Sequence, residues 1–298
     1  MYKDFESLVN ARLDRNAPAK VAIVAGADDE HVLEAVFSAQ EKGYATPILV
    51  GDQEKVVAVI QKLNYTNREF EIVHTNANPA ETAVKLIHEE RGHYIIKGKM
   101  ETRDLLKPIL NKETGLNKQG FITHFGCMQL KGHNKLLSIS DSAVIPHPTF
   151  EDKIKIVREG IRTLSKLGYE KPVVAALCAV ETVNEKMPET VEAQKLQEMS
   201  DDGAFAPGIV IGPISYDLAT EKESAKIKGY DKPYAGDADM LLVPQMVTGN
   251  VMSKIWNVNP ENSMAGCLVG TDIPIVLTSR SASMNEKLNS IILCALLS

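Results

Sequence analysis

The chain has 298 residues, of which 44% are hydrophobic and 24% charged, and its formal net charge is -6 at pH 7. This length suits two α/β domains, and the negative balance argues against nucleic acid or an anionic membrane as the main partner. No apolar run approaches the roughly 18 residues that a membrane span needs, and the first residues contain no apolar segment typical of a secretory signal.

The four cysteines point to a reducing compartment. They are far apart, lie in apolar contexts and form no C-x-x-C pair: Cys127, Cys178, Cys267 and Cys294. Cysteines in such contexts are usually buried and reduced. We therefore expect free thiols in a cytoplasmic protein.

Strands and helices alternate through the first third of the chain. Short apolar runs predict strands at Lys20–Gly26, Thr46–Val50, Phe70–His74 and Tyr94–Ile96. Amphipathic stretches predict helices within Met1–Arg15 and at Asp28–Lys42, Asp52–Leu63, Pro79–Glu90 and Thr102–Leu110, with Asp28 as the candidate N-cap of the second. This alternation is typical of a parallel sheet covered on both faces.

The alternation is interrupted after Gly115. Two strand-like runs, Phe121–Leu130 and Lys135–Ser140, are separated by the four residues K-G-H-N. This spacing predicts a hairpin, so we expect some antiparallel pairing in an otherwise parallel sheet.

The second half returns to the α/β alternation. The expected helices are Phe150–Leu167, Thr190–Glu198, Asp217–Lys226, Thr248–Asn257 and a last one from Met284 to the C-terminus. The expected strands are Pro172–Ala176, Gly208–Gly212, Asp239–Val243, Ala265–Val269 and Pro274–Leu277. We predict an α/β fold of two α/β/α domains, with residues 1–132 and the C-terminal helix 284–298 in one and 133–283 in the other.

Polar residues follow several of these strands, at the sheet edge where parallel α/β proteins bind ligands. The loops 97–102, 213–217, 244–250 and 278–281 are rich in Gly, Lys, Arg and hydroxyl side chains. The last loop precedes a helix with Ser283 as its candidate N-cap, and Arg280 offers a planar fork for phosphate or carboxylate oxygens. The pattern favours a phosphorylated ligand, although a polar loop with ordinary capping would look similar.

Other motifs carry less. The sequence around Lys99 has the wrong spacing for a P-loop, and no G-x-G-x-x-G follows the first strand. Asp237 and Asp239 could ligate a metal, but capping a turn or holding a neighbouring loop is the simpler role, and we expect no metal site. His124 lies in an apolar run, where a hydrogen-bonded buried histidine is a simpler interpretation than a general base.

Five blocks, in this order, resemble the phosphate acetyl/butyryl transferase family over essentially the whole length, and its butyryl and branched-chain members most. They are IIKGKMETRDLLKPILNKETGL (95–116), LLSISDSAVIPHPTFEDK (136–153), GPISYDLA (212–219), YAGDADMLLVPQMVTGN (234–250) and PIVLTSRSASMNEKLNSI (274–291). Two residues beside the expected site depart from the family pattern: Gln245 stands where Asn or Asp is usual, and Ser253 stands where Tyr is usual.

The resemblance implies a reaction, in which acyl-CoA and phosphate give acyl phosphate and CoA. It implies two α/β/α domains with an active-site cleft between them, as in isocitrate and isopropylmalate dehydrogenases, and a homodimer or larger assembly. It implies no cofactor beyond coenzyme A as substrate and no metal. An acyl phosphate would also suit a kinase partner that uses it.

The same resemblance assigns catalysis to Ser279 and Arg280, with a carboxylate seven residues after the serine, which here is Glu286. The CoA thiol, with a pKa near ~8.5, attacks best as a thiolate, so a base is needed. Glu286 is the candidate base, and an exposed acidic residue in the first turn of a helix is its alternative. Ser279 would orient the sulfur and Arg280 would stabilise developing negative charge.

The remaining candidate contacts for CoA and phosphate are Lys97, Thr102, Gly212, Pro213, Asn250, Thr278 and Ser281. The leading hypothesis is a short-chain phosphate acyltransferase acting on butyryl or branched acyl groups. An acetyl-specific enzyme is the alternative within the family. A metal- and NAD-dependent decarboxylating dehydrogenase and a non-catalytic acyl-CoA binder are alternatives of other classes.

Overall fold

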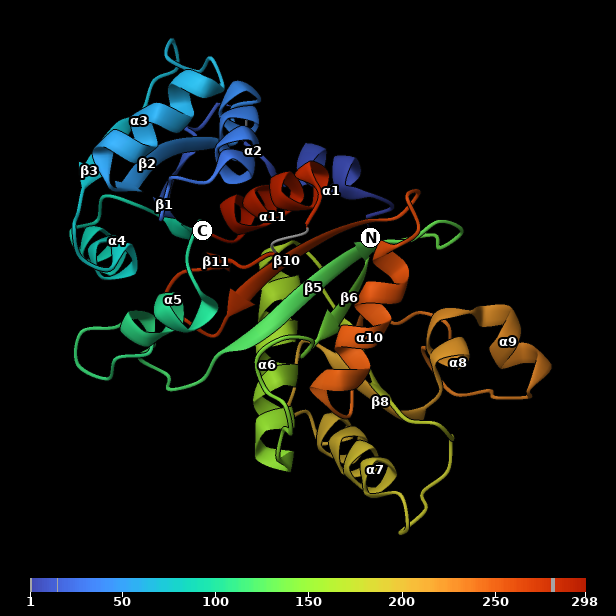
Figure 1. Ribbon diagram of the computed structural model, residues 1–298. Helices are drawn as coiled ribbons and strands as arrows, with labels where there is room; N and C mark the ends of the chain where they lie inside the picture. Colours follow the sequence, from blue (N-terminus) through green and yellow to red (C-terminus); the bar gives the residue numbers. More distant parts are fainter. Residues whose placement is uncertain (1, 15, 280–281) are drawn as a thin grey trace. The chain divides into compact units, whose positions relative to one another are not determined.

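The structure is a computed structural model that describes residues 2–14, 16–279 and 282–298. The chain forms two compact units. The terminal unit consists of Val9–Ile122 and Met264–Ser298, and the central unit of Met1–Leu8 and Thr123–Ser263. Each unit is an α/β structure with mostly parallel strands, as the sequence predicted (Figure 1).

In the terminal unit the strands follow the order β3-β2-β1-β4-β11-β10. Their bounds are β1 (Lys20–Ala25), β2 (Ala45–Gly51), β3 (Glu71–His74), β4 (Tyr94–Lys97), β10 (Ser263–Val269, from Met264 in this unit) and β11 (Ile275–Val276). All neighbours pair in parallel except β10 and β11, which are antiparallel. The carboxyl ends of β1, β4 and β11 therefore lie side by side at one edge.

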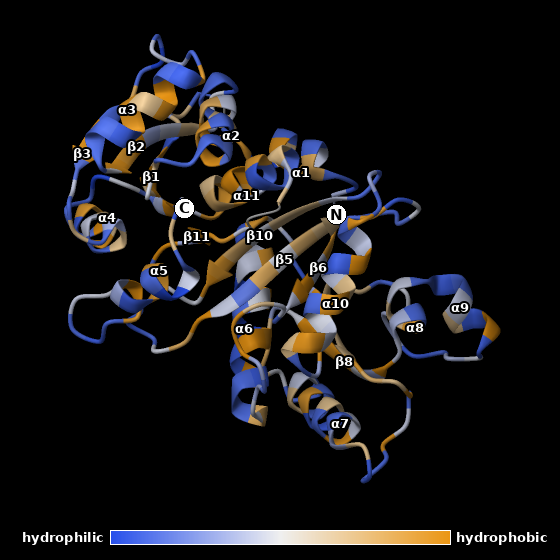
Figure 2. Ribbon diagram, in the orientation of Figure 1, coloured by the Kyte–Doolittle hydropathy of each residue, from blue (hydrophilic) through white to orange (hydrophobic). Residues whose placement is uncertain are grey.

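The helices of this unit are α2 (Glu30–Glu41), α3 (Gln53–Lys62), α4 (Pro79–His88), α5 (Thr102–Ile109) and α11 (Met284–Leu297), and α1 (Phe5–Arg12) begins in the central unit. Side chains cap several of them, because the first amides of a helix have no partner within it. Asp29, rather than Asp28, caps α2 by accepting from the Val32 amide. Helix α11 packs against α2, and its largely orange ribbon in Figure 2 fits a helix buried on most sides.

In the central unit the strands follow the order β5-β6-β9-β7-β8. Their bounds are β5 (Thr123–Gln129), β6 (Leu137–Ser140), β7 (Val173–Leu177), β8 (Ile209–Ile214) and β9 (Met240–Leu242). Strands β5 and β6 form the predicted antiparallel hairpin, and the other neighbours are parallel. The helices are α6 (Phe150–Lys166), α7 (Pro188–Asp201), α8 (Tyr216–Thr220), α9 (Lys222–Ile227) and α10 (Met246–Asn257).

One predicted helix is interrupted in the structure. The stretch Asp217–Lys226 is divided into α8 and α9, because Glu221 adopts an extended conformation with φ -127° and ψ 110°. A second difference concerns β8, which continues to Ile214 instead of ending at Gly212. This extension matters for the site, because it moves two predicted loop residues into the strand.

The boundaries predicted from the sequence differ from the two compact units. The central unit already includes β5, which the sequence assigned to 1–132, and the chain returns to the terminal unit at Met264 instead of 284. The two compact units do not test whether the predicted domains fold independently. The division into 1–132 with 284–298 and 133–283 therefore stays a prediction. Within the described ranges, every helix is too short or too polar to cross a membrane.

Candidate active site

A cavity of about 590 Å³ lies at the edge of the terminal unit where β1, β4 and β11 end. It receives residues from the start of α2, from the loop after β4, from the segment after β11 and from α11. The lining residues are Asp29, His31, Val32, Lys97, Gly98, Lys99, Met100, Glu101, Thr278, Ser279 and Lys287. Two of the four loops that the sequence singled out thus contribute to one cavity.

The loop after β4 is fixed by a close backbone approach. The amide of Gly98 donates to the carbonyl of Ala25 at 2.8 Å, and the amide of Lys99 donates to the carbonyl of Gly26 at 2.8 Å. A Cβ added at Gly98 would lie 2.0 Å from the Gly26 carbonyl oxygen, so no side chain fits there. Glycine at position 98 therefore lets the loops after β1 and β4 meet and places Lys97 at the cavity.

The segment after β11 leads into α11. Thr278 is half-buried and Ser279 is exposed, and both line the cavity. Arg280 and Ser281, two of the predicted site residues, lie outside the described residues. Ser283 caps α11 as predicted, since its hydroxyl oxygen accepts from the amide of Glu286 at 3.1 Å.

Glu286 is only 5% exposed. The alternative interpretation, in which Glu286 is an exposed residue of the first helical turn, is therefore wrong, because the side chain is buried. A buried carboxylate in the first turn of α11, close in sequence to Ser279, is compatible with the role of a base. Thr102, by contrast, is exposed at the start of α5, directly after the lining residue Glu101.

Charged side chains of both signs line the cavity. Three lysines line it, Lys97, Lys99 and Lys287, against the two carboxylates of Asp29 and Glu101. One of these lysines is paired, since the ammonium of Lys99 lies 3.3 Å from the carboxylate of Asp28. The lysines, together with nearby helix starts, suit an anionic ligand.

Three predicted substrate contacts belong to the central unit, where they pack or hydrogen-bond against neighbouring elements. Gly212 and Pro213 lie buried inside β8, where a Cβ on Gly212 would come within 2.9 Å of the Ala176 side chain. The amide nitrogen of Asn250 donates to the carbonyl of Ser142 at 3.1 Å. These contacts hold strands, α10 and the turn after β6 together.

The sequence analysis missed a buried polar cluster in that turn. The carboxylate of Asp141 accepts from the Thr123 hydroxyl at 2.7 Å, from the His124 amide at 2.9 Å and from the two amides at 143 and 144. The Ser142 hydroxyl lies 2.9 Å from Nδ1 of His124, and both side chains are buried. His124 is thus the hydrogen-bonded histidine that the sequence favoured.

The acidic pair near β9 has ion-pair partners. The carboxylate of Asp239 lies 2.7 Å from the Lys135 ammonium and also accepts from the amide of Val173, while Asp237 pairs with Lys222 at 2.6 Å. Across the described ranges, no group of three or more His, Cys, Asp or Glu side chains is placed to hold a metal ion. The four cysteines are free thiols, and Cys178 is half-buried while the other three are buried.

The comparisons with known proteins agree with this fold. A family model described as phosphate acetyl/butaryl transferase matches residues 5–97 and 74–295. A phosphate butyryltransferase of Clostridium acetobutylicum is 39% identical over 99% of this chain and 98% of its own length. A phosphate acetyltransferase of Rhizobium meliloti is also 39% identical, over 94% of this chain and 89% of its own.

Among solved structures, a branched-chain phosphotransacylase from Enterococcus faecalis V583 superposes with a TM-score of 0.82 at 29% identity, over 93% of this chain and 98% of that one. The fold is thus that of a phosphotransacylase. The chain belongs to the phosphate acetyl/butaryl transferase family. It is an acyltransferase enzyme, as the resemblance implied, and this membership goes against the dehydrogenase alternative.

Proposed function

We propose that the chain transfers short acyl groups, butyryl or branched, between CoA and inorganic phosphate, and that the cavity of the terminal unit binds the reacting groups. The observation that carries this proposal is the convergence of three lysines, the Thr278 and Ser279 side chains and the start of α11 on one cavity. A phosphotransacylase must hold a phosphate beside a thioester, and such a set of cations and hydroxyls suits a phosphate.

In one direction, a phosphate oxygen attacks the thioester carbonyl carbon. A tetrahedral intermediate forms, the C–S bond breaks and CoA leaves as a thiolate, which takes up the proton that the hydrogen phosphate gives up. In the other direction, the CoA thiol loses its proton, the sulfur attacks the acyl phosphate and the C–O bond to phosphate breaks. Glu286 accepts or returns this proton, because a carboxylate is a general base at neutral pH.

The remaining roles follow the polarity of the groups. Ser279 donates a hydrogen bond to the sulfur and orients it. Arg280 stabilises negative charge on the phosphate or on the carbonyl oxygen. Lys97, Thr102, Thr278 and Ser281 provide further contacts to phosphate or CoA. Gly212, Pro213 and Asn250 stay predicted contacts, and their described surroundings also hold the central unit together.

The test measures thiol release from butyryl-CoA with and without inorganic phosphate. Phosphate-dependent release, with formation of butyryl phosphate, is the expected result. Release without phosphate would indicate a thioesterase and contradict the proposal, as would a lack of release from any short acyl-CoA. Rates with acetyl-, butyryl- and isobutyryl-CoA side by side decide between the butyryl and acetyl alternatives, since relatives of both names are 39% identical to this chain.

We also propose that the protein forms a homodimer through α10. Four aliphatic side chains at helical spacing are 48% to 81% exposed along this helix and at its end: Val247, Val251, Ile255 and Val258. Among the described helices α10 alone has no Asp or Glu. In a chain of net charge -6, a face without acidic residues suits contact with a second copy, and a stripe along a helix can pack on itself around a twofold axis.

The dimer is tested by light scattering after gel filtration. The variant Ile255→Glu is expected to be a monomer, because two carboxylates would be buried without partners at the twofold contact. Ile227→Glu is the matched control: Ile227 on α9 is 77% exposed, compared with 62% for Ile255, and its replacement should leave the mass unchanged. An unchanged mass in Ile255→Glu would remove α10 from the interface. A cytoplasmic location and a kinase partner that uses the acyl phosphate stay predictions.

A further inference from the structure

The buried lysines of this chain differ in the partners that compensate their charge. Among the residues that the structure describes, three lysines are buried: Lys135 is 3% exposed, Lys153 6% and Lys287 6%. Burying an ammonium group is costly unless an opposite charge and hydrogen bonds compensate for the lost water. The partners of each buried lysine are therefore informative.

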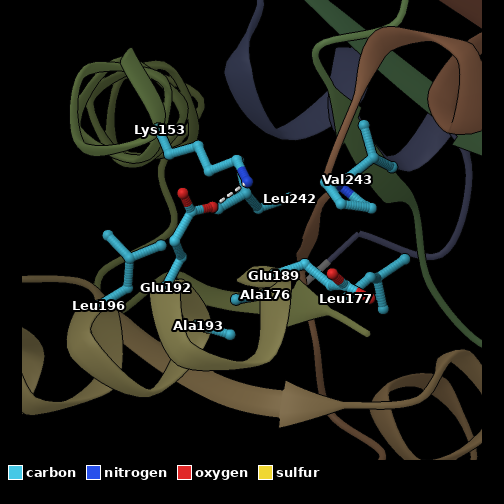
Figure 3. A pocket seen from close by; sticks show the side chains of 10 residues that line it. Lys153, Ala176, Leu177, Glu189, Glu192, Ala193, Leu196, Leu242 and Val243 are labelled. Carbon is cyan, nitrogen blue, oxygen red and sulfur yellow. Dashed lines mark hydrogen bonds and ion pairs between the residues drawn. The ribbon is translucent and has the colours of Figure 1, made fainter. Parts of the chain in front are cut away.

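The two buried lysines of the central unit each have a carboxylate partner. The ammonium of Lys135 lies 2.7 Å from the Asp239 carboxylate and donates to the carbonyl of Asp237 at 2.7 Å. The ammonium of Lys153 forms an ion pair with Glu192, drawn as a dashed line in Figure 3. A cavity of about 10 Å³ beside this pair has room for about one water molecule and for nothing larger.

Lys287 in α11 differs from both. Its ammonium donates to the carbonyl of Ala282 at 2.6 Å. Over residues 2–14, 16–279 and 282–298 it has no second hydrogen-bond partner and no carboxylate within ion-pair distance. An ammonium has three donors, so two N–H groups and a positive charge are left without a counterpart in this part of the chain.

The surroundings of Lys287 supply the place for that counterpart. Lys287 lines the cavity of about 590 Å³, which is large enough for a ligand, together with Thr278 and Ser279. Its side chain is on the buried face of α11, as the burial of Ser290, Ile291 and Cys294 three, four and seven residues later indicates. The bond to Ala282 also restrains the ammonium, which is then oriented before any ligand arrives.

We propose that Lys287 binds the phosphate group of the substrate, as orthophosphate in one direction and as the phosphoryl group of the acyl phosphate in the other. This inference rests on the function proposed above. Two N–H groups of one ammonium can donate to two phosphate oxygens, and the charge offsets part of the charge of the dianion. Lys287 undergoes no covalent change and transfers no proton.

A purely structural role would use only the bond to Ala282, which ties α11 to the segment before it. The two roles predict different outcomes for Lys287→Met, which keeps the length of the side chain and removes the charge. Loss of a charged hydrogen-bond donor to phosphate should raise the KM for phosphate about 10- to 100-fold. The KM for acyl-CoA should change less than about threefold, because the thioester carries no phosphate at the reacting carbon.

A binding measurement complements the kinetics. Inorganic phosphate should raise the melting temperature of the wild-type protein, since a ligand that binds only the folded state stabilises it. This increase should be absent in Lys287→Met and partly restored in Lys287→Arg, which keeps the charge. Lys153→Met is the matched control: it should lower the melting temperature by leaving Glu192 unpaired and keep the response to phosphate.

The inference is overturned if Lys287→Met retains the wild-type KM for phosphate and the full phosphate-induced increase in melting temperature. It is also overturned if both KM values change equally, the melting temperature falls and Lys287→Arg restores nothing, which would mark a structural tie. Wild-type turnover separates the two proposals. If the wild-type protein releases CoA without phosphate, both the proposed function and this inference are contradicted. If the wild-type protein shows phosphate-dependent activity and Lys287→Met is unaffected, only this inference is contradicted.

Discussion

The two units of the chain treat buried charge differently. In the central unit, Lys135 pairs with Asp239, Lys153 pairs with Glu192, and the carboxylate of Asp141 accepts four hydrogen bonds. In the terminal unit, the buried ammonium of Lys287 has one neutral partner in the described part of the chain and faces a cavity. Charges with a full set of partners hold a fold together, whereas a buried charge left short of partners beside a cavity indicates a ligand.

The largest effect is expected from Glu286→Gln. The amide keeps the shape of the side chain but cannot accept the thiol proton, so kcat in the direction of acyl-CoA synthesis should fall about 10²- to 10⁴-fold. Steady-state rates with butyryl phosphate and CoA measure this. The melting temperature should change little. A rate within a few-fold of the wild type would show that Glu286 is not the base.

The next largest effect concerns the buried ion pair of the central unit. Asp239→Asn would leave the Lys135 ammonium buried without its carboxylate, and the free energy of unfolding should fall by about 3–5 kcal/mol. Asp237→Asn is the matched control, because the ion pair of Asp237 with Lys222 is solvent-accessible and worth at most about 1 kcal/mol. Urea denaturation compares the two. Equal losses would contradict the distinction between buried and exposed pairs.

The smallest effect concerns the wall of the cavity. Gly98→Ala places a Cβ 2.0 Å from the Gly26 carbonyl oxygen, so the loops after β1 and β4 must separate, at a cost of about 1–3 kcal/mol in stability. The KM for phosphate should rise because Lys97 and Lys99 move with the loop. Gly51→Ala, where the nearest atoms lie at 3.5 Å, should have little effect on either quantity. The same response in both variants would mean that the close approach does not shape the cavity.

Much of the fold follows from local patterns in the sequence. Alternating apolar runs and amphipathic stretches located the strands and most helices, and the four residues after Leu130 indicated the hairpin of β5 and β6. The break at Glu221 was missed, because each neighbouring residue is an acceptable helix former. The extension of β8 through Pro213 was missed because proline usually ends a strand, yet β8 is the last strand in the order of its unit, where proline is tolerated.

The candidate site could be predicted only in part. Thr278 and Ser279 follow a strand and Lys97 ends one, so position in the chain pointed to them. Lys287 was missed because the burial of a lysine depends on what covers the helix, although its spacing of three, four and seven from Ser290, Ile291 and Cys294 was visible in the sequence. The bonds of Asp141 to Thr123 and His124 depend on strand register, which residue types alone do not give.

The short bond from Lys287 to the Ala282 carbonyl has a practical consequence for handling the enzyme. A restrained ammonium with spare donors does not distinguish sharply between tetrahedral anions, so sulfate should occupy the same place as phosphate. Ammonium sulfate, used for salting out, and sulfate buffers should then protect the protein against heat and at the same time inhibit it in competition with phosphate. Assays after such steps need thorough desalting, or the apparent affinity for phosphate will reflect the purification.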